Sequence, residues 1–172
     1  VEDVKLQQIG ECDWKLTWHE DFPLKHRRLM LKSAWRPWQP VIEEKIPDEN
    51  RGEFTLHGIS LPPSRYEVYF YIRHSWEPSL RTPPEDGVRH QIDLCTPEER
   101  LTALDNTQGD HNVAFQNCIE RAIILDSLGK TEERDESVSS AATHLIHLQN
   151  VRILVESVKW MQSVDIAPPY MG

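Results

Sequence analysis

Histidines are the residues of this sequence whose type and spacing come closest to a metal-binding pattern. His144 and His147 lie three positions apart in a stretch with helical periodicity, so both can face one ion. His111 lies in a polar break of the sequence, directly after Asp110. The sequence has no HExxH motif, and eight scattered histidines are explained more simply as free surface side chains. We keep His111, His144 and His147 as secondary metal candidates and expect neither a metal nor a cofactor.

Aromatic side chains offer a second kind of chemistry, namely flat faces for a ligand. Tyr69 and Tyr71 occupy the side of an alternating segment where charged or small polar residues are usual, and together they form a patch that water covers poorly. Trp38 lies between Pro37 and Pro40, outside the regular strand pattern, so its ring could be displayed. Tyr69, Tyr71 and Trp38 are therefore candidate ligand-binding residues, unless the chain itself covers them.

Catalytic motifs are absent from the sequence. It contains no GxSxG nucleophile elbow and neither of the glycine-rich phosphate loops, GxGxxG and GxxxxGK[ST]. The carboxylate pairs at 43–44 and 98–99 are interpreted as solvated charges and as a helix cap. An enzyme is accordingly the less favoured interpretation.

Composition bounds the class of protein. The 172 residues are 38% hydrophobic and 27% charged, which suits a chain with its own hydrophobic core. The net charge of -9 disfavours nucleic-acid binding, and no apolar run approaches the length needed to cross a bilayer. Three widely spaced cysteines favour a reducing, cytoplasmic setting. Because the chain begins at Val1 instead of methionine, we expect it to be a piece of a longer protein.

Residues 1–94 show the two-residue periodicity of strands with one buried face. About seven short strands fit this part, which is the number expected of an immunoglobulin-like antiparallel β-sandwich. Trp14, Trp18 and Trp35 are expected in the core with the apolar side of these strands. The other core residues that we predict are Leu16, Leu31, Phe54, Tyr66, Val68, Phe70, Ile72 and Ile92.

Residues 95–172 change to helical periodicity, and no proline occurs between 98 and 167. We predict one short helix after the cap at Thr96, a long helix around Phe115–Leu125, and a second long helix from Val138 to near Trp160. The fold class is therefore α+β with segregated parts, the sandwich first and the helices second. The buried helix residues that we predict are Phe115, Ile119, Ala122, Leu145, Leu148 and Val155.

One segment, residues 29–94, resembles a known family. It contains Trp35-Arg36-Pro37-Trp38, then Gly52-Glu53-Phe54-Thr55-Leu56, then the run from Leu61-Pro62-Pro63 through Tyr66 to Ile72, and then Ser75-Trp76. In this order the segment is similar to the immunoglobulin-like sandwiches of glycogen- and starch-binding modules. The resemblance implies that Trp38 and Trp76 match the two sugar-stacking positions of that family.

Three functions follow from these observations. The favoured one is a non-catalytic interaction module of a larger intracellular protein, which binds another protein or an adjoining domain. The first alternative is a glucan-binding module that uses Trp38, Tyr69, Tyr71 and Trp76. The second alternative is a metal-dependent enzyme with the three candidate histidines.

Overall fold

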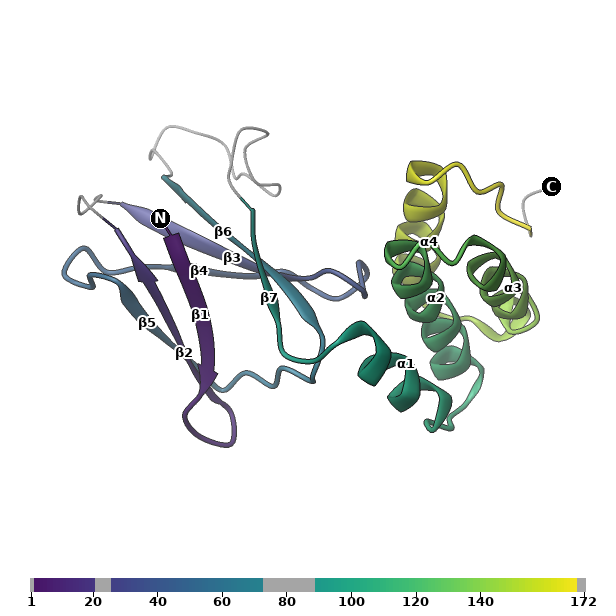
Figure 1. Ribbon diagram of the computed structural model, residues 1–172, viewed down its shortest axis with the longest axis horizontal. Coiled ribbons are helices and arrows are strands. Elements are labelled where there is room, and N and C mark those ends of the chain that lie inside the picture. The colour runs from purple at the N-terminus through teal and green to yellow at the C-terminus, as the bar shows by residue number, and fades with distance from the viewer. Residues whose placement is uncertain (1, 21–25, 73–88, 170–172) are drawn as a thin grey trace. The chain divides into compact units, whose positions relative to one another are not determined.

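The computed structural model describes residues 2–20, 26–72 and 89–169 (Figure 1). Their contacts divide the chain into two compact units, which are described separately. The sandwich unit comprises residues 1–33 and 41–94, and the helical unit comprises residues 34–40 and 95–172. The boundary expected between residues 94 and 95 therefore missed the loop 34–40, which belongs with the helices.

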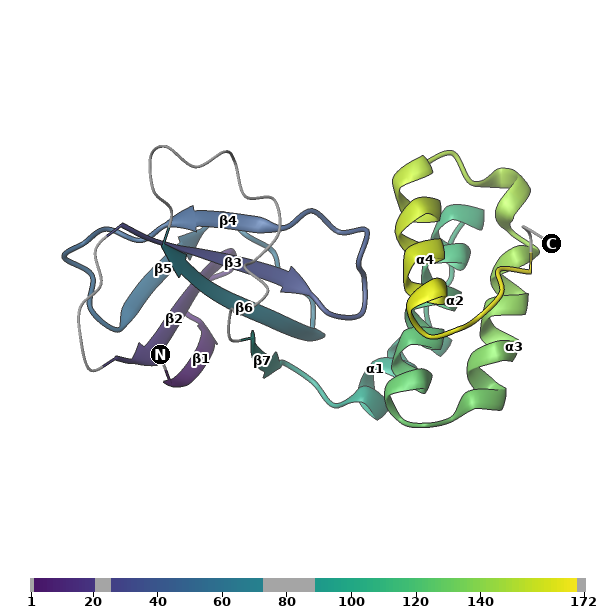
Figure 2. The same ribbon diagram turned by 90° about the horizontal axis from the view of Figure 1, so that it is seen from above.

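The described part of the sandwich unit has seven strands in two antiparallel sheets (Figures 1 and 2). One sheet has the order β1-β2-β5 and the other the order β4-β3-β6-β7. This arrangement confirms an immunoglobulin-like sandwich followed by helices. The strands are β1 Glu2–Gln8, β2 Asp13–His19, β3 Arg27–Ser33, β4 Ile42–Lys45, β5 Glu53–His57, β6 Arg65–Ile72 and β7 Arg89–Asp93.

The sandwich core follows from the alternation of each strand. β2 is the clearest case, because Trp14, Leu16 and Trp18 are buried while the residues between them are not. Phe54 and Phe70, which we expected to be buried, are only partly covered, and the side chain of Ile72 lies outside the described residues. The predictions confirmed as buried are Trp14, Trp18, Leu16, Leu31, Tyr66, Val68 and Ile92.

A tyrosine corner fixes the entry to β6. The hydroxyl of Tyr66 donates a hydrogen bond of 2.7 Å to the backbone carbonyl of Pro62, four residues earlier. This contact is a hallmark of immunoglobulin-like sandwiches. It explains why a Leu-Pro turn precedes a tyrosine-bearing strand here without any requirement for a sugar ligand.

The described part of the helical unit has four helices and one 3-10 turn. In that part of the chain no helix combines the length and the hydrophobicity that crossing a bilayer requires. Thr96 and Glu99 cap the first helix reciprocally, and Asp110 and Asn150 cap two others through their side chains. The elements are α1 Pro97–Asp105, α2 His111–Ser127, α3 Thr131–Ala142, η1 Leu145–His147 and α4 Val151–Ser163.

The long helix expected from Val138 to near Trp160 is wrong. Residues 143–150 interrupt it, because Leu148 is extended and Asn150 starts a new helix. α4 then buries Ile153, Ser157 and Met161. These residues lie four apart and define a new inward face that does not continue the earlier stripe.

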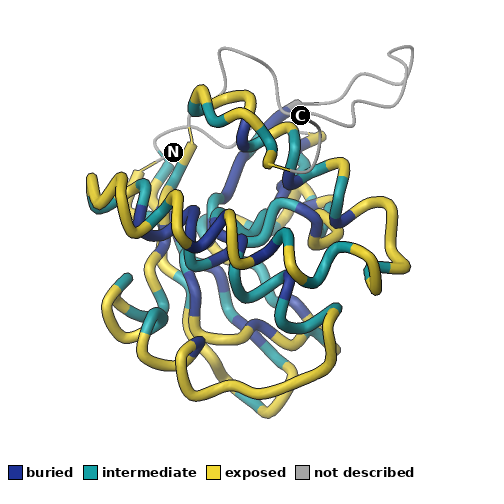
Figure 3. The backbone as a smooth tube through the Cα atoms, turned by 90° about the vertical axis from the view of Figure 1, so that its right-hand side faces the viewer, coloured by how far each residue is buried: buried dark blue, intermediate teal, exposed yellow. Residues whose placement is uncertain are grey.

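The break also changes which side chains are covered. Phe115, Ile119 and Ala122 of α2 are fully buried, as expected. Leu145 and Leu148 are only partly buried. Val155 is 43% exposed, so its expected burial is wrong. Figure 3 shows that buried and exposed residues alternate along the helices.

Candidate functional site

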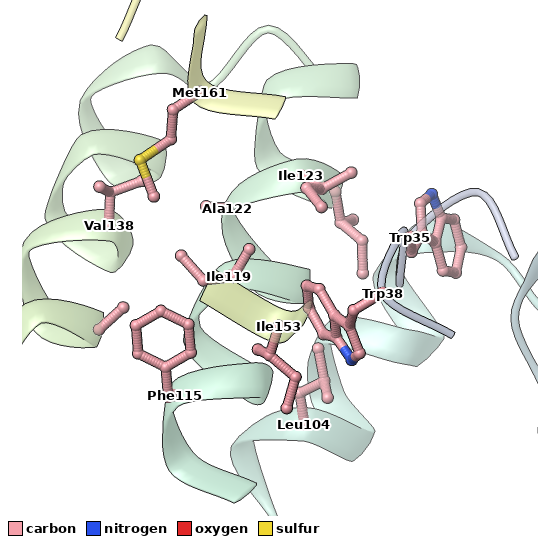
Figure 4. Close-up of a cluster of buried hydrophobic side chains, with 12 residues drawn as sticks. Trp35, Trp38, Leu104, Phe115, Ile119, Ala122, Ile123, Val138, Ile153 and Met161 are labelled. Carbon is pink, nitrogen blue, oxygen red and sulfur yellow. The ribbon is translucent and has the colours of Figure 1, made fainter. Parts of the chain in front are cut away.

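The loop 34–40 contributes two tryptophans to the hydrophobic cluster of the helical unit. Figure 4 shows the ring of Trp38 among the side chains of the helices. Trp35 and Trp38 are 2% and 4% exposed, and they belong to one cluster with residues of α1, α2 and α4. Trp35 is therefore a core residue of the helical unit, not of the sandwich as expected. Trp38 offers no free face to a sugar, because the helices cover its ring. Trp76, the other candidate from the family resemblance, lies outside the described residues.

A buried carboxylate holds this loop in place. Glu120 of α2 is fully buried, and its two oxygens lie 3.2 Å from Nε of Arg36 and 2.5 Å from Nε of Arg100. Gln116, one turn earlier on α2, accepts hydrogen bonds from Arg36 Nη2 at 2.9 Å and from Trp38 Nε1 at 3.1 Å. The loop is thus bound by paired charges and amide contacts as well as by apolar packing.

Arg152 of α4 adds a further contact to the same loop. Its Nε donates a hydrogen bond of 2.8 Å to the backbone carbonyl of Trp38. The polar groups around Trp38 are therefore used inside the unit, and the loop is structural.

Tyr69 and Tyr71 are buried as well, with 2% and 5% of their surface exposed. With Met30 they form a small cluster on the side of the β3–β6 pair that faces away from the sandwich core. The hydroxyl of Tyr69 donates to Glu67 at 3.0 Å, and that of Tyr71 donates to Glu43. The two rings are therefore covered, and they do not offer the free faces that a role as ligand-binding residues would require.

The two tyrosines predict a loss of stability in alkali. Burial, together with the neighbouring carboxylates of Glu67 and Glu43, raises the pKa of Tyr69 and of Tyr71 to about 12, from an ordinary value of 10.0. Between pH 10 and pH 12 the unfolded chain ionises these hydroxyls and the folded chain does not, so stability is full below pH 10 and falls as the pH rises. We expect urea midpoints to fall across this range, and a Tyr69→Phe/Tyr71→Phe variant to lose part of that fall. An equal fall in both proteins would contradict the prediction.

The structure brings the three candidate histidines together. Nδ1 of His111 lies 2.9 Å from Nδ1 of His144, and the ring of His147 stacks on that of His111 with centroids 4.0 Å apart. The centroids of His111 and His144 are 5.1 Å apart, and this exceeds the nitrogen separation by 2.2 Å, close to the full distance from the two ring centres out to their nitrogens. The two nitrogens therefore face each other head-on.

A head-on contact suits a hydrogen bond, in which one ring donates and the other accepts. A metal ion held at about 2.1 Å from each nitrogen has no room between them. Consistently, no group of three potential ligands among the described residues is arranged to hold an ion. The histidines instead join the start of α2 to the connection between α3 and α4.

Among the described residues, the edge strands β4 and β5 of the two sheets border one open side of the sandwich. A hollow of about 400 Å³ lies there. β1 and β7, the opposite edges, approach each other on the other side. The residues that line the hollow are Glu44, Asn50, Phe54, Thr55, Leu56 and His57.

β5 is a regular strand edge next to this hollow. Its five residues pair without a shift, from Asp13 opposite His57 to Thr17 opposite Glu53, and it contains no proline. Two of the other edges are modified, as is common for strands that must not recruit partners, and β7, which is as regular as β5, approaches β1. β1 has a register shift between Glu2 and Lys5, and β4 has only four residues. β5 is therefore the edge best suited to accept another strand.

Glu44 places a carboxylate in the hollow. Ile42 packs on the sandwich core, and Glu44, two positions later, lies on the same side of β4. Its neighbour across the sheet is Leu29, a fully buried core residue. Glu44 is exposed, and it forms no hydrogen bond or ion pair with another described residue.

Sequence interpretation missed this site, although one signal for it was present. The spacing of Ile42 and Glu44 puts a charge on the apolar side of a strand. Glu44 is exposed, as its interpretation as a solvated charge requires, and the signal lies in the side of the strand that it occupies. The edge position of β5 had no signal in the sequence, because it depends on which strands pair.

A second hollow, of about 280 Å³, lies between α3 and the residues after α4. Its one cation, Arg134, already pairs with Asp126 and Asp135 at 2.7 and 3.1 Å. It therefore offers no free charge of that sign to a ligand, and the open side of the sandwich is the stronger candidate.

Comparisons with known proteins add little to this geometry. No protein-family model matches the chain, and no match was found among curated proteins. A β-sandwich protein obtained by computer-based redesign is 15% identical, covers 53% of this chain and 88% of its own, and has a TM-score of 0.35. The FN5 domain of Drosophila Lar is 13% identical, covers 54% of this chain and 90% of its own, and has the same TM-score. Neither is described as a glycogen- or starch-binding module.

Proposed function

We propose that this chain is a non-catalytic protein-interaction module that binds an extended segment of a partner by strand addition to β5. The observation that carries the proposal is a regular strand edge that pairs with no other described strand and lies beside a hollow. Strand addition obtains affinity from backbone hydrogen bonds and specificity from pockets for alternate side chains. The three free cysteines support a reducing, cytoplasmic setting for the module.

The hydrogen-bond pattern of β5 identifies the backbone groups that would take part. The N–H of Trp18 donates to the carbonyl of Gly52 at 3.0 Å, which makes this opposed pair a hydrogen-bonded one. Hydrogen-bonded and non-hydrogen-bonded pairs alternate along an antiparallel ladder. Phe54 and Leu56 therefore direct their backbone groups to β2. Glu53, Thr55 and His57 direct theirs to the free edge.

A proline substitution tests the proposal. Thr55→Pro removes an N–H from the free edge and leaves the ladder with β2 complete, which is where proline is tolerated in sheets. The probe is a fluorescent heptapeptide, Ser-Val-Thr-Nle-Thr-Val-Ser, with norleucine at its centre. We expect fluorescence anisotropy to show binding in the micromolar to millimolar range, at least about tenfold weaker for Thr55→Pro.

Thr55→Val is the matched control, because it keeps the N–H and the branched shape, and it should bind within about twofold of the unmodified protein. Two further probes, one N-methylated on the amides of one edge and the other on the amides of the opposite edge, test the same bonds without changing the protein, in case Thr55→Pro fails to fold. Only one of these two edges can pair with β5 in a given register. Undiminished binding of the probe by folded Thr55→Pro, equal binding of both N-methylated registers and the parent probe, or no binding up to about 1 mM would overturn the proposal.

A further inference from the structure

We infer that the segment added to β5 carries a lysine or arginine whose side chain enters the hollow beside Glu44. This inference rests on the proposed function and gives the chemistry of its partner. It follows from the direction of alternate side chains in an added strand and from the unpaired charge that they meet.

An added strand extends the β1-β2-β5 sheet past β5, so every second side chain points toward the facing sheet. At this edge the facing sheet ends at β4, and the space between is the hollow of about 400 Å³. One inward side chain of the added strand thus has both room and a defined set of neighbours.

The walls of the hollow differ in character. Phe54 is half-buried, packs against the sandwich core and gives β5 an apolar wall. Glu44 on β4 gives the opposite wall an acidic group. A long side chain with an apolar stem and a cationic end matches both walls, and only lysine and arginine have that form.

The surrounding charges favour a cation. Lys45 follows Glu44 on β4 and so points to the other side of that strand. His57 faces Asp13, with 3.1 Å between Nδ1 and Oδ1, and Lys15 lies 3.2 Å from Glu53. Lys15 of β2 and His57 of β5 are therefore matched by carboxylates, while the carboxylate of Glu44 has no partner among the described residues. An acidic or phosphorylated segment would meet a like charge here.

Three matched probes test the inference. They are the norleucine heptapeptide and its versions with lysine or glutamate at the centre, titrated against the unmodified protein, Glu44→Gln and Glu49→Gln. Glu49 lies in the connection between β4 and β5 and does not line the hollow, so Glu49→Gln controls for a general loss of negative charge.

We expect the lysine probe to bind about fivefold tighter than the norleucine probe, as suits a partly exposed ion pair, and the glutamate probe to bind more weakly than either. Glu44→Gln should abolish the lysine advantage and Glu49→Gln should keep it. Added salt should reduce the advantage through screening.

An equal affinity for lysine and norleucine probes, or an advantage that survives in Glu44→Gln, would overturn the inference. The norleucine probe separates this failure from that of the proposed function. If it binds Thr55→Val but not Thr55→Pro, strand addition to β5 stands and only the preference for a cation is lost.

Discussion

Glu120→Ala is expected to lower the free energy of unfolding of the helical unit by about 3–5 kcal/mol. The carboxylate of Glu120 is fully buried and pairs with Arg36 and Arg100, whose side chains are only 19% and 15% exposed. Its removal leaves two guanidinium groups largely desolvated without their counter-charge. Hydrogen exchange of the slowest amides of α2 measures this free energy, and the backbone of residues 34–40 should lose protection as well.

Two variants control this experiment. Glu132→Ala removes an exposed carboxylate from the first turn of α3 and should cost less than about 1 kcal/mol. Replacing Glu120, Arg36 and Arg100 together by Leu, Met and Met should restore most of the stability, because no charge is then left unpaired. A loss below about 1 kcal/mol in Glu120→Ala would show that water reaches this carboxylate.

Trp38→Ala is expected to cost about 3–5 kcal/mol in the same unit, because it removes a large side chain from a packed core. Trp38→Phe keeps most of the ring but loses the N–H that donates to Gln116, so it should cost less.

The unmodified protein should migrate in an amylose-containing native gel as it does without amylose. Retardation by amylose that Trp38→Ala abolishes would contradict the burial of this ring and revive the sugar-binding interpretation.

The order of motifs that resembles glucan-binding modules has a structural explanation in this protein. Trp38 follows an early strand in both, and a Leu-Pro turn precedes an aromatic strand in both. In this protein Tyr66 uses that turn for a structural hydrogen bond, and the helical unit covers Trp38. The same order of motifs therefore stabilises the fold here. Of the two tryptophans that match sugar-stacking positions, the described one, Trp38, is buried.

The sequence by itself determined the class of fold and most of its elements. Alternation along β2, β3 and β6 identified strands with one apolar side, because side chains of a strand point alternately to opposite faces. The cap at Thr96 and the spacing of Phe115, Ile119 and Ala122 identified α1 and α2, because both signals are local to a helix. Signals of this kind depend only on residues that are close together in the chain, so they can be recognised without knowledge of the tertiary structure.

Only the tertiary structure decided which partner each element meets. Trp35 is in phase with a sandwich strand, yet the chain leaves β3 at Ser33 and takes this ring into the helical core. Val155 continues a stripe that begins in α3, yet the break at 143–150 turns it outward. The edge of β5 and the inward carboxylate of Glu44 likewise depend on strand pairing. Pairing and docking are contacts between residues far apart in the chain, and no periodicity within one element specifies them.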